Sequence, residues 1–125
     1  MIPKFRARDQ RGNWHIGLLT FMFGQYAIVN EADENTVYLI DKETIGQSIG
    51  LKDKNGVEIF EGDLVEHDDN INGTWETFEA CEIVYDGDYA QFCFKNDASN
   101  FLSYYRNLCI IGNIHENPEL LEVAE

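Results

Sequence analysis

The stretch from Gly46 to Val65, GQSIGLKDKNGVEIFEGDLV, constrains the fold of this chain more than any other segment. Its centre, Asp53-Lys54-Asn55-Gly56, is a turn signal, because Asn and Gly tolerate the positive φ that a tight hairpin turn requires. Short strand-like segments lie on either side, at residues 49–51 and 57–60. A second reversal at Glu61-Gly62-Asp63 leads into a further strand. The pattern predicts short antiparallel strands joined by tight turns.

Alternation of apolar and polar residues predicts strands along the rest of the chain as well. Trp14 to Phe23 and Gln25 to Val29 flank Gly24 as a hairpin. The clearest hairpin joins Glu79–Tyr85 to Tyr89–Lys95 through the tight turn Asp86-Gly87-Asp88. The remaining expected elements are strands at 5–8, 36–40, 63–67 and 108–114, a turn or single helical turn at 41–46, and a polar loop at 68–74.

These segments predict a mainly β protein in a single domain, residues 1–125. Strands this short leave exposed edges, and closure of about residues 46–125 into a small SH3-like barrel would remove them. The amino-terminal part, about residues 1–45, is expected to form an antiparallel β layer packed on that barrel. Asn117-Pro118-Glu119 marks the start of a short C-terminal helix from Glu119 to Val123, with Asn as cap and Pro at the first helical position.

Charge is the strongest compositional feature, with nine Lys and Arg against 23 Asp and Glu and a formal net charge of −14. It is unevenly distributed. Residues 1–30 hold four basic residues against Asp9, whereas residues 31–125 hold five against 22 acidic ones. A field of that sign repels phosphate backbones, which disfavours general nucleic-acid binding and favours basic partners. A solvated acidic surface without a binding role is the simpler interpretation.

Several classes of function find no support in the sequence. No run of about 18 uncharged apolar residues would span a membrane, and residues 1–6 lack the apolar core of a signal peptide, which indicates the cytosol. The chain has no Gly-rich phosphate loop and no GxSxG motif, and Ser48, Ser99 and Ser103 lack the spacing of a triad. We therefore expect no enzyme, no catalytic or cofactor-binding residues and no cofactor.

Metal-binding patterns are weak, and we expect no metal site. His67-Asp68-Asp69 together with His115-Glu116 offers suitable ligand types, but the spacing matches no defined motif. Asp86-Gly87-Asp88 resembles the start of a calcium loop and lacks the later ligands, so a simple turn is favoured. Three cysteines form no CxxC pair and lie in apolar runs, which favours buried, unreactive thiols. They are Cys81, Cys93 and Cys109.

A basic strip is the main candidate for contacts with a partner. Lys4, Arg6 and Arg8 alternate along an expected strand and so share one face. The strip could bind phosphate while Trp14 stacks on a base. Pairing with acids of the same chain or of a neighbouring copy is favoured, because a basic arm and an acidic body are complementary, and this predicts a homo-oligomer. Exposed aromatics would anchor a protein contact or, equally, form core: Trp14, Trp75, Tyr104 and Tyr105.

Three blocks of sequence resemble the YopX family, small proteins of bacteriophages and prophages. They are Pro3-Lys4-Phe5-Arg6-Ala7, then residues 50–56 (GLKDKNG) continuing to Glu61-Gly62-Asp63, and the ending at 111–121 (IGNIHENPELL). The chain departs from the family at Arg8 and at Ser48-Ile49, where the family favours an aromatic residue and an aromatic-Thr pair. The resemblance implies a mostly β protein in a bacterial cytoplasm, and it supplies no established activity and no catalytic residues.

The resulting hypothesis is a non-enzymatic phage or prophage protein that binds a host or phage protein through its acidic surface, in the cytoplasm of a bacterial host. One alternative is a DNA mimic that blocks a nucleic-acid-binding host protein. Another is a nucleic-acid-binding β-barrel that uses the basic strip, against which the acidic body weighs. An enzyme would require a pocket with clustered carboxylates or histidines.

Overall fold

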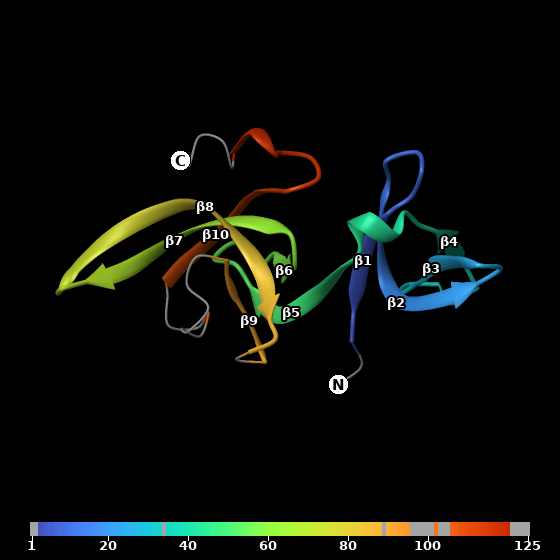
Figure 1. Cartoon of the computed structure of the whole chain (residues 1–125), viewed down its shortest axis with the longest axis horizontal. Coiled ribbons are helices and arrows are strands. Elements are labelled where there is room, and N and C mark those ends of the chain that lie inside the picture. Colours follow the sequence, from blue (N-terminus) through green and yellow to red (C-terminus); the bar gives the residue numbers. More distant parts are fainter. Residues whose placement is uncertain (1–2, 34, 89, 96–101, 103–105, 121–125) are drawn as a thin grey trace. The chain divides into compact units, whose positions relative to one another are not determined.

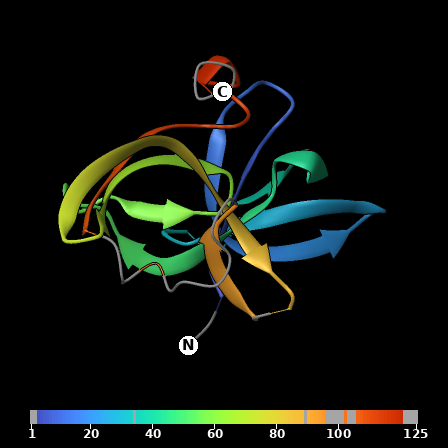
Figure 2. The ribbon, with the colours of Figure 1, turned by 60° about the vertical axis from the view of Figure 1, so that its left-hand side comes forward.

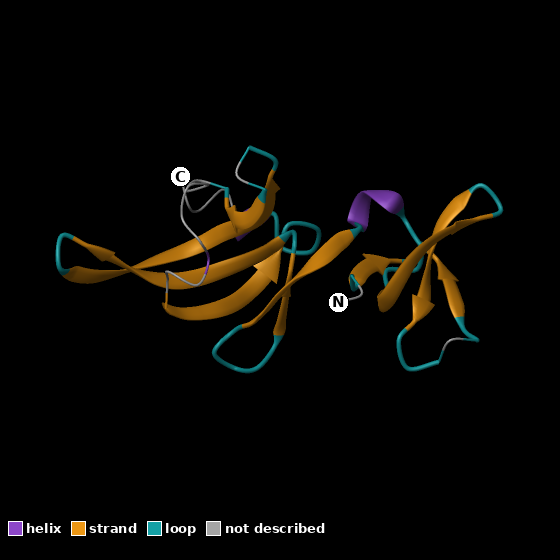
Figure 3. Cartoon of the chain, turned by 90° about the horizontal axis from the view of Figure 1, so that it is seen from below, coloured by secondary structure: helices purple, strands orange, loops and turns teal. Residues whose placement is uncertain are grey.

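The computed structural model describes residues 3–33, 35–88, 90–95, 102 and 106–120, and the protein is mainly β (Figures 1 and 3). Its strands form two antiparallel sheets, ordered β4-β3-β2-β1-β5-β6 and β10-β7-β8-β9. The elements are β1 (Phe5–Arg8), β2 (Trp14–Met22), β3 (Gln25–Asn30), β4 (Val37–Leu39), the 3₁₀ helix η1 (Lys42–Thr44), β5 (Gly46–Lys52), β6 (Glu58–Phe60), β7 (Asp63–Ile71), β8 (Thr74–Asp86), β9 (Gln91–Phe94) and β10 (Arg106–Asn113). The chain divides into two compact units, residues 1–48 and 49–125, and β5 runs through the boundary.

In the first unit, β2 is the central strand and pairs with β1 and β3, as the predicted hairpin around Gly24 requires. Gly17 lies opposite Phe5 on one side and Asn30 on the other. A Cβ atom at Gly17 would lie 1.8 Å from the carbonyl oxygen of Val29, so only glycine fits this close approach. The core consists of Ala7, Ile28 and Ile40, surrounded by Phe5, Leu19, Tyr38 and Ile45.

In the second unit, β7, β8 and β9 follow one another as antiparallel neighbours, and the predicted hairpin of β8 and β9 is confirmed with Tyr85 opposite Phe92. Buried apolar side chains from successive elements form one core: Ile59, Val65, Ile83, Phe94 and Leu102. Burial of side chains of this size contributes about 1.5–3 kcal/mol each, so this cluster is the main stabilising feature of the unit.

The prediction of a polar loop at residues 68–74 is wrong. β7 and β8 pair to the end of a long ribbon, and only Asn72-Gly73 form the turn (Figure 2). Both turn residues have positive φ, 52° and 88°, as a two-residue type I′ hairpin requires. Asn-Gly is the preferred pair for that turn, so its local chemistry outweighs the polarity of the flanking residues.

The described strand pairs leave the second sheet open, with β10 and β9 at its two ends. The expected closed barrel is therefore not part of the described pairing. Of the expected terminal helix, only Glu119 and Leu120 are described, both helical, and residues 121–123 lie outside the described residues. The candidate anchors Tyr104 and Tyr105 also lie outside them.

Candidate interaction surfaces

The basic strip lies on one face of the first sheet, as predicted. Arg8 lies opposite Trp14 in the register of β1 and β2, and both arginine guanidinium groups lie over the Trp14 ring, 5.0 Å from its centroid for Arg6 and 5.6 Å for Arg8. Such cation–π contacts contribute about 0.5–1 kcal/mol at exposed sites. Lys4 Nζ lies 3.2 Å from a carboxylate oxygen of Glu31. The basic side chains of the strip therefore contact residues of their own chain. Because both arginines lie over the Trp14 ring, they compete with any base that would stack on it.

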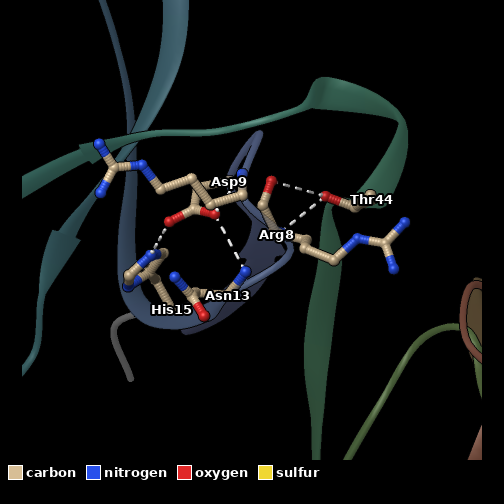
Figure 4. A network of polar contacts seen from close by, with 6 residues as sticks. Arg8, Asp9, Asn13, His15 and Thr44 are labelled. Atoms are coloured by element: carbon tan, nitrogen blue, oxygen red, sulfur yellow. Dashed lines mark hydrogen bonds and ion pairs between the residues drawn. The ribbon is translucent and has the colours of Figure 1, made fainter.

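The loop between β1 and β2 is organised by the carboxylate of Asp9 (Figure 4). One oxygen accepts the backbone N–H groups of Arg11, at 2.9 Å, and Asn13, at 3.0 Å. The other lies 2.8 Å from Nε2 of His15, whose ring stacks on Tyr38 at a centroid distance of 3.7 Å. The bond to His15, followed by the bonds from the loop backbone, lowers the pKa of Asp9 to about 2. This network is a structural lock on the loop.

The helical turn predicted after β4 is confirmed as η1, and it is bonded to the end of β1 (Figure 4). The Arg8 backbone N–H donates to Thr44 Oγ1 at 2.7 Å, and the backbone N–H of Asp41 donates to the carbonyl oxygen of Arg8 at 2.8 Å. Asp41 caps the turn by accepting the N–H of Glu43. The buried Thr44 thereby satisfies the backbone of two segments that are far apart in sequence.

We expect the pKa of the Asp9 carboxyl, measured by NMR titration, to lie near 2 and to rise towards 3.8 in a His15→Phe variant. Phenylalanine keeps a ring against Tyr38 and removes the hydrogen bond. Because the folded-state pKa is depressed, Asp9 stabilises the fold fully above about pH 4, and this contribution is lost as the pH falls towards 2. An unchanged Asp9 pKa in His15→Phe would show that His15 does not cause the shift.

Two of the three sequence blocks quoted in the sequence analysis, residues 50–56 and 111–121, lie next to each other in the second unit, where the buried Asp53 bonds to Ile110 just before the second of them. One oxygen accepts the N–H groups of Asn55, at 2.9 Å, and Val57, at 3.0 Å, and so closes the predicted turn. The other accepts the N–H of Ile110 in β10 at 3.1 Å. Burial of the carboxylate favours a higher pKa, but these three hydrogen bonds outweigh it and hold the pKa of Asp53 below its usual value.

Hydrogen bonds also connect the motif Glu61-Gly62-Asp63 to its neighbours in the chain and to the residue that follows β10. The buried Asp63 accepts the N–H of Phe60 at 2.8 Å, and the N–H of Ile114 donates to the carbonyl oxygen of Gly62 at 2.9 Å. Gly112 lies at a register shift in β10, and a Cβ there would lie 2.5 Å from the side chain of Asn117. The buried carboxylates of these blocks accept hydrogen bonds from the backbone of the unit, so their role in the fold is structural.

The residues of the two weak candidate metal sites lie in separate parts of the second unit. His67 is buried, with its ring stacked on Phe94 at a centroid distance of 4.1 Å, and Asp68 accepts from the side chains of Thr77 and Asn107. His115 belongs to the turn after β10, and Asp86 accepts the N–H of Asp88 in an ordinary turn. No group of three or more His, Cys, Asp or Glu among the described residues could hold a metal ion.

All three cysteines lie in the second unit and are free thiols. Cys93 is fully buried, and Cys81 and Cys109 are half-buried. Burial raises the pKa of the Cys81 thiol, which lowers the fraction of the reactive thiolate at neutral pH. The described geometry thus gives these residues the character of small apolar side chains.

β7 and β8 pair as a long ribbon rich in acidic residues, and we call it the acidic arm (Figure 1). Its residues, 63–86, contain eight Asp and Glu, of which Asp63 is buried, and no Lys or Arg. Three aromatic side chains of the arm are exposed, Trp75 by 41%, Phe78 by 39% and Tyr85 by 53%. Exposed aromatic rings surrounded by charge are typical of protein contact sites. Trp75, one of the predicted anchors, is therefore on the surface.

A second exposed surface was not predicted from the sequence. The outer part of the β2–β3 hairpin, residues 18–26, extends beyond the segments paired with β1 and β4, and we call it the aromatic ribbon (Figures 1 and 2). It exposes Phe21 by 61%, Phe23 by 90% and Tyr26 by 39%. A usable signal was present, since residues 12–30 contain no Asp, Glu, Lys or Arg in a chain that is 26% charged.

Comparison with known proteins identifies the family. The model of the YopX protein family matches residues 4–122. The chain belongs to the YopX family. It is similar to a solved structure, protein EF1440 from Enterococcus faecalis, with 30% sequence identity, a TM-score of 0.54, and coverage of 97% of this chain and 99% of that one. No curated protein matches the chain. No described helix of this YopX-family protein is long and apolar enough to cross a membrane.

Proposed function

We propose that this YopX-family protein is a non-enzymatic binding protein that docks on a basic surface of a host or phage protein, in the cytoplasm of a bacterial host. The acidic arm is the proposed docking surface. The observation that carries this proposal is the charge of the arm, where seven Asp and Glu besides the buried Asp63 stand with no Lys or Arg. Such a surface attracts a Lys- and Arg-rich partner and accelerates its association.

The exposed rings of Trp75 and Phe78 support the same surface, because aromatic side chains supply most of the binding free energy in protein interfaces. A small SH3-like barrel remains our proposed description of the second unit. The turn between β5 and β6 is bonded to β10 by a hydrogen bond of 2.7 Å from the Lys54 N–H to the carbonyl oxygen of Leu108. That bond draws the short hairpin and the curved sheet around one core.

The test is capture of partners from bacterial lysate by the wild-type chain and by a Trp75→Ala/Glu76→Lys variant. Glu43→Lys, which changes an exposed acid of η1 by the same charge, is the matched control. We expect a basic protein that survives nuclease treatment, is released by high salt, and is retained about tenfold less by the arm variant than by the control. A partner retained equally by both variants would overturn the assignment to the acidic arm.

Two other outcomes identify the alternatives. Competition with DNA for the captured protein would indicate a DNA mimic. Retention that disappears with nuclease and is abolished by charge reversal at Arg6 and Arg8 would indicate a nucleic-acid-binding module. The nucleic-acid-binding module is not favoured, because Lys4 pairs with Glu31 and the guanidinium groups of the two arginines lie over Trp14.

A further inference from the structure

The aromatic ribbon has an edge that no described strand covers. β1 pairs with β2 only as far as Phe5 opposite Gly17. In β3, the Tyr26 carbonyl accepts the N–H of Ile40 and the Asn30 N–H donates to Thr36, so residues 26, 28 and 30 turn their polar groups towards β4. Residues 25, 27 and 29 consequently face β2, and their partners there are 22, 20 and 18.

It follows from this alternation that Leu19 and Phe21 direct their backbone N–H and C=O groups to the opposite, outer edge of β2. Among the described residues, no strand lies against them there. The edge sequence Leu19-Thr20-Phe21-Met22 is uncharged, lacks proline and is rich in residues that favour strands. Proteins normally protect such an edge with charge, proline or a cover, because it is a template for another strand.

The turn of the ribbon supplies a second, independent observation. Phe23 and Gly24 form its two-residue turn with φ values of 52° and 75°. The equivalent turn of the acidic arm uses Asn72-Gly73 for nearly the same conformation. Phenylalanine in this left-handed conformation costs about 1–2 kcal/mol, and the ring is 90% exposed in addition. A residue that is unfavourable in both respects points to a contact made by this tip.

The distribution of charge indicates which partner can cover the edge. Residues 1–48 carry five Lys and Arg against six Asp and Glu, whereas residues 49–125 carry four against seventeen. Two copies that met through their second units would repel each other strongly. Two copies that meet through the uncharged segment 12–30 bring nearly neutral units together, so a second copy of the chain is compatible with this surface.

We infer that the aromatic ribbon is a self-association surface, in which the outer edges of β2 from two copies pair antiparallel about a two-fold axis at Thr20. Leu19 of each copy then lies opposite Phe21 of the other and exchanges two backbone hydrogen bonds with it. Phe21, which already forms an edge-to-face pair with Tyr26 at 5.1 Å, then packs against Leu19 of the second copy and lies diagonally from its Phe21.

The area involved indicates a weak dimer. Phe21, Phe23 and Tyr26 together expose the equivalent of nearly two aromatic side chains, or about 400 Å² per copy. Two copies would bury about 800 Å² of aromatic surface, to which the paired backbone and Leu18 add. That total lies near the lower end of specific protein interfaces. We expect association to depend on concentration.

The first experiment is sedimentation velocity over a range of concentrations. We expect a monomer–dimer equilibrium that Phe21→Asp weakens about tenfold or more, since two added carboxylates would meet at the pairing centre. Tyr85→Asp, on a side chain that is 53% exposed in the second unit, is the matched control and should dimerise normally. A wild-type chain that stays monomeric, or a dimer indifferent to Phe21→Asp, overturns the inference.

The second experiment tests the register. In a Thr20→Cys variant the two introduced thiols would face each other across a non-hydrogen-bonded pair, with Cα atoms about 4.5 Å apart, within the range of a disulfide. Mild oxidation should join the two introduced thiols in a disulfide, located by mass spectrometry, with wild type and Thr74→Cys as controls for the native thiols. Linkage no greater than in Thr74→Cys contradicts the pairing.

A Phe23→Asn variant separates the role of this surface from simple stability. Asparagine accepts the left-handed conformation, so the variant should unfold at a higher temperature while it dimerises more weakly than wild type. A merely structural role would move stability alone. An unchanged dimer constant in Phe23→Asn, together with normal association of Phe21→Asp, would also rule the ribbon out as the interface.

Discussion

Replacing Gly17 by alanine should destabilise the first unit by about 3 kcal/mol or more, the largest effect expected from adding a single methyl group to this chain. The added Cβ would lie 1.8 Å from the carbonyl oxygen of Val29 and 3.1 Å from the backbone nitrogen of Glu31. Both are backbone atoms of the neighbouring strand, which cannot rotate away as a flexible side chain can. The strands must separate, and Gly17 pairs with Phe5 and Asn30 at once.

Hydrogen–deuterium exchange with mass spectrometry, combined with denaturant unfolding, checks this expectation. The loss of protection should centre on peptides from β2 and β3. Gly87→Ala is the matched control, because its Cβ would meet no atom within 4 Å and its φ is not in the left-handed region. The control should stay within about 0.5 kcal/mol of wild type. Equal protection in the two variants would show that the strands tolerate the clash.

Replacing Asp53 by alanine should destabilise the second unit by about 3 kcal/mol. The change leaves the N–H groups of Asn55, Val57 and Ile110 without their acceptor, and each hydrogen bond to a charged group contributes about 1.5–3 kcal/mol, part of which water at the cavity recovers. Asp53→Asn keeps one oxygen and should fall between alanine and wild type. Denaturant midpoints measured at pH 7 compare the three proteins.

The pH dependence of the free energy of unfolding gives a separate check of the role of Asp53. The folded-state pKa of Asp53 is lowered, so its stabilisation is complete above the unfolded value near 3.8 and is lost as the pH falls below it. The stability difference between wild type and Asp53→Asn should therefore shrink on acidification. Asp86→Ala, which removes a carboxylate that accepts one exposed N–H in its own turn, serves as control. A difference independent of pH would contradict the role assigned to the carboxylate.

The aromatic ribbon shows where reasoning from the sequence stopped short. Trp14 to Phe23 was identified correctly as a strand, because alternation and β-forming residues are local properties. Which of its side chains become core depends on where β1 and β4 end. Leu19 packs beside Ile28 in the core, whereas Phe21, two residues further on the same face, pairs with Tyr26 beyond the segments that β1 and β4 pair with.

The buried carboxylates also separate what local sequence predicts from what only the fold decides. The turn at Asp53 was predicted from its own residues, since Asn55-Gly56 favours it in any context. The bond to Ile110 could not be predicted, because it joins positions 57 residues apart in sequence. His67 illustrates the consequence for function: its neighbours suggested a metal ligand, and the fold placed its ring against Phe94 instead.

By itself, the sequence determined most of the strands and turns, the acidic excess of residues 31–125 and membership of the YopX family, because these depend on local residue chemistry or on residue order. The tertiary structure alone decided which charged side chains are engaged within the chain, which carboxylates are buried and bonded to backbone, and which aromatic rings are left exposed. Those properties arise from contacts between strands distant in sequence, and such contacts exist only once the strands have paired.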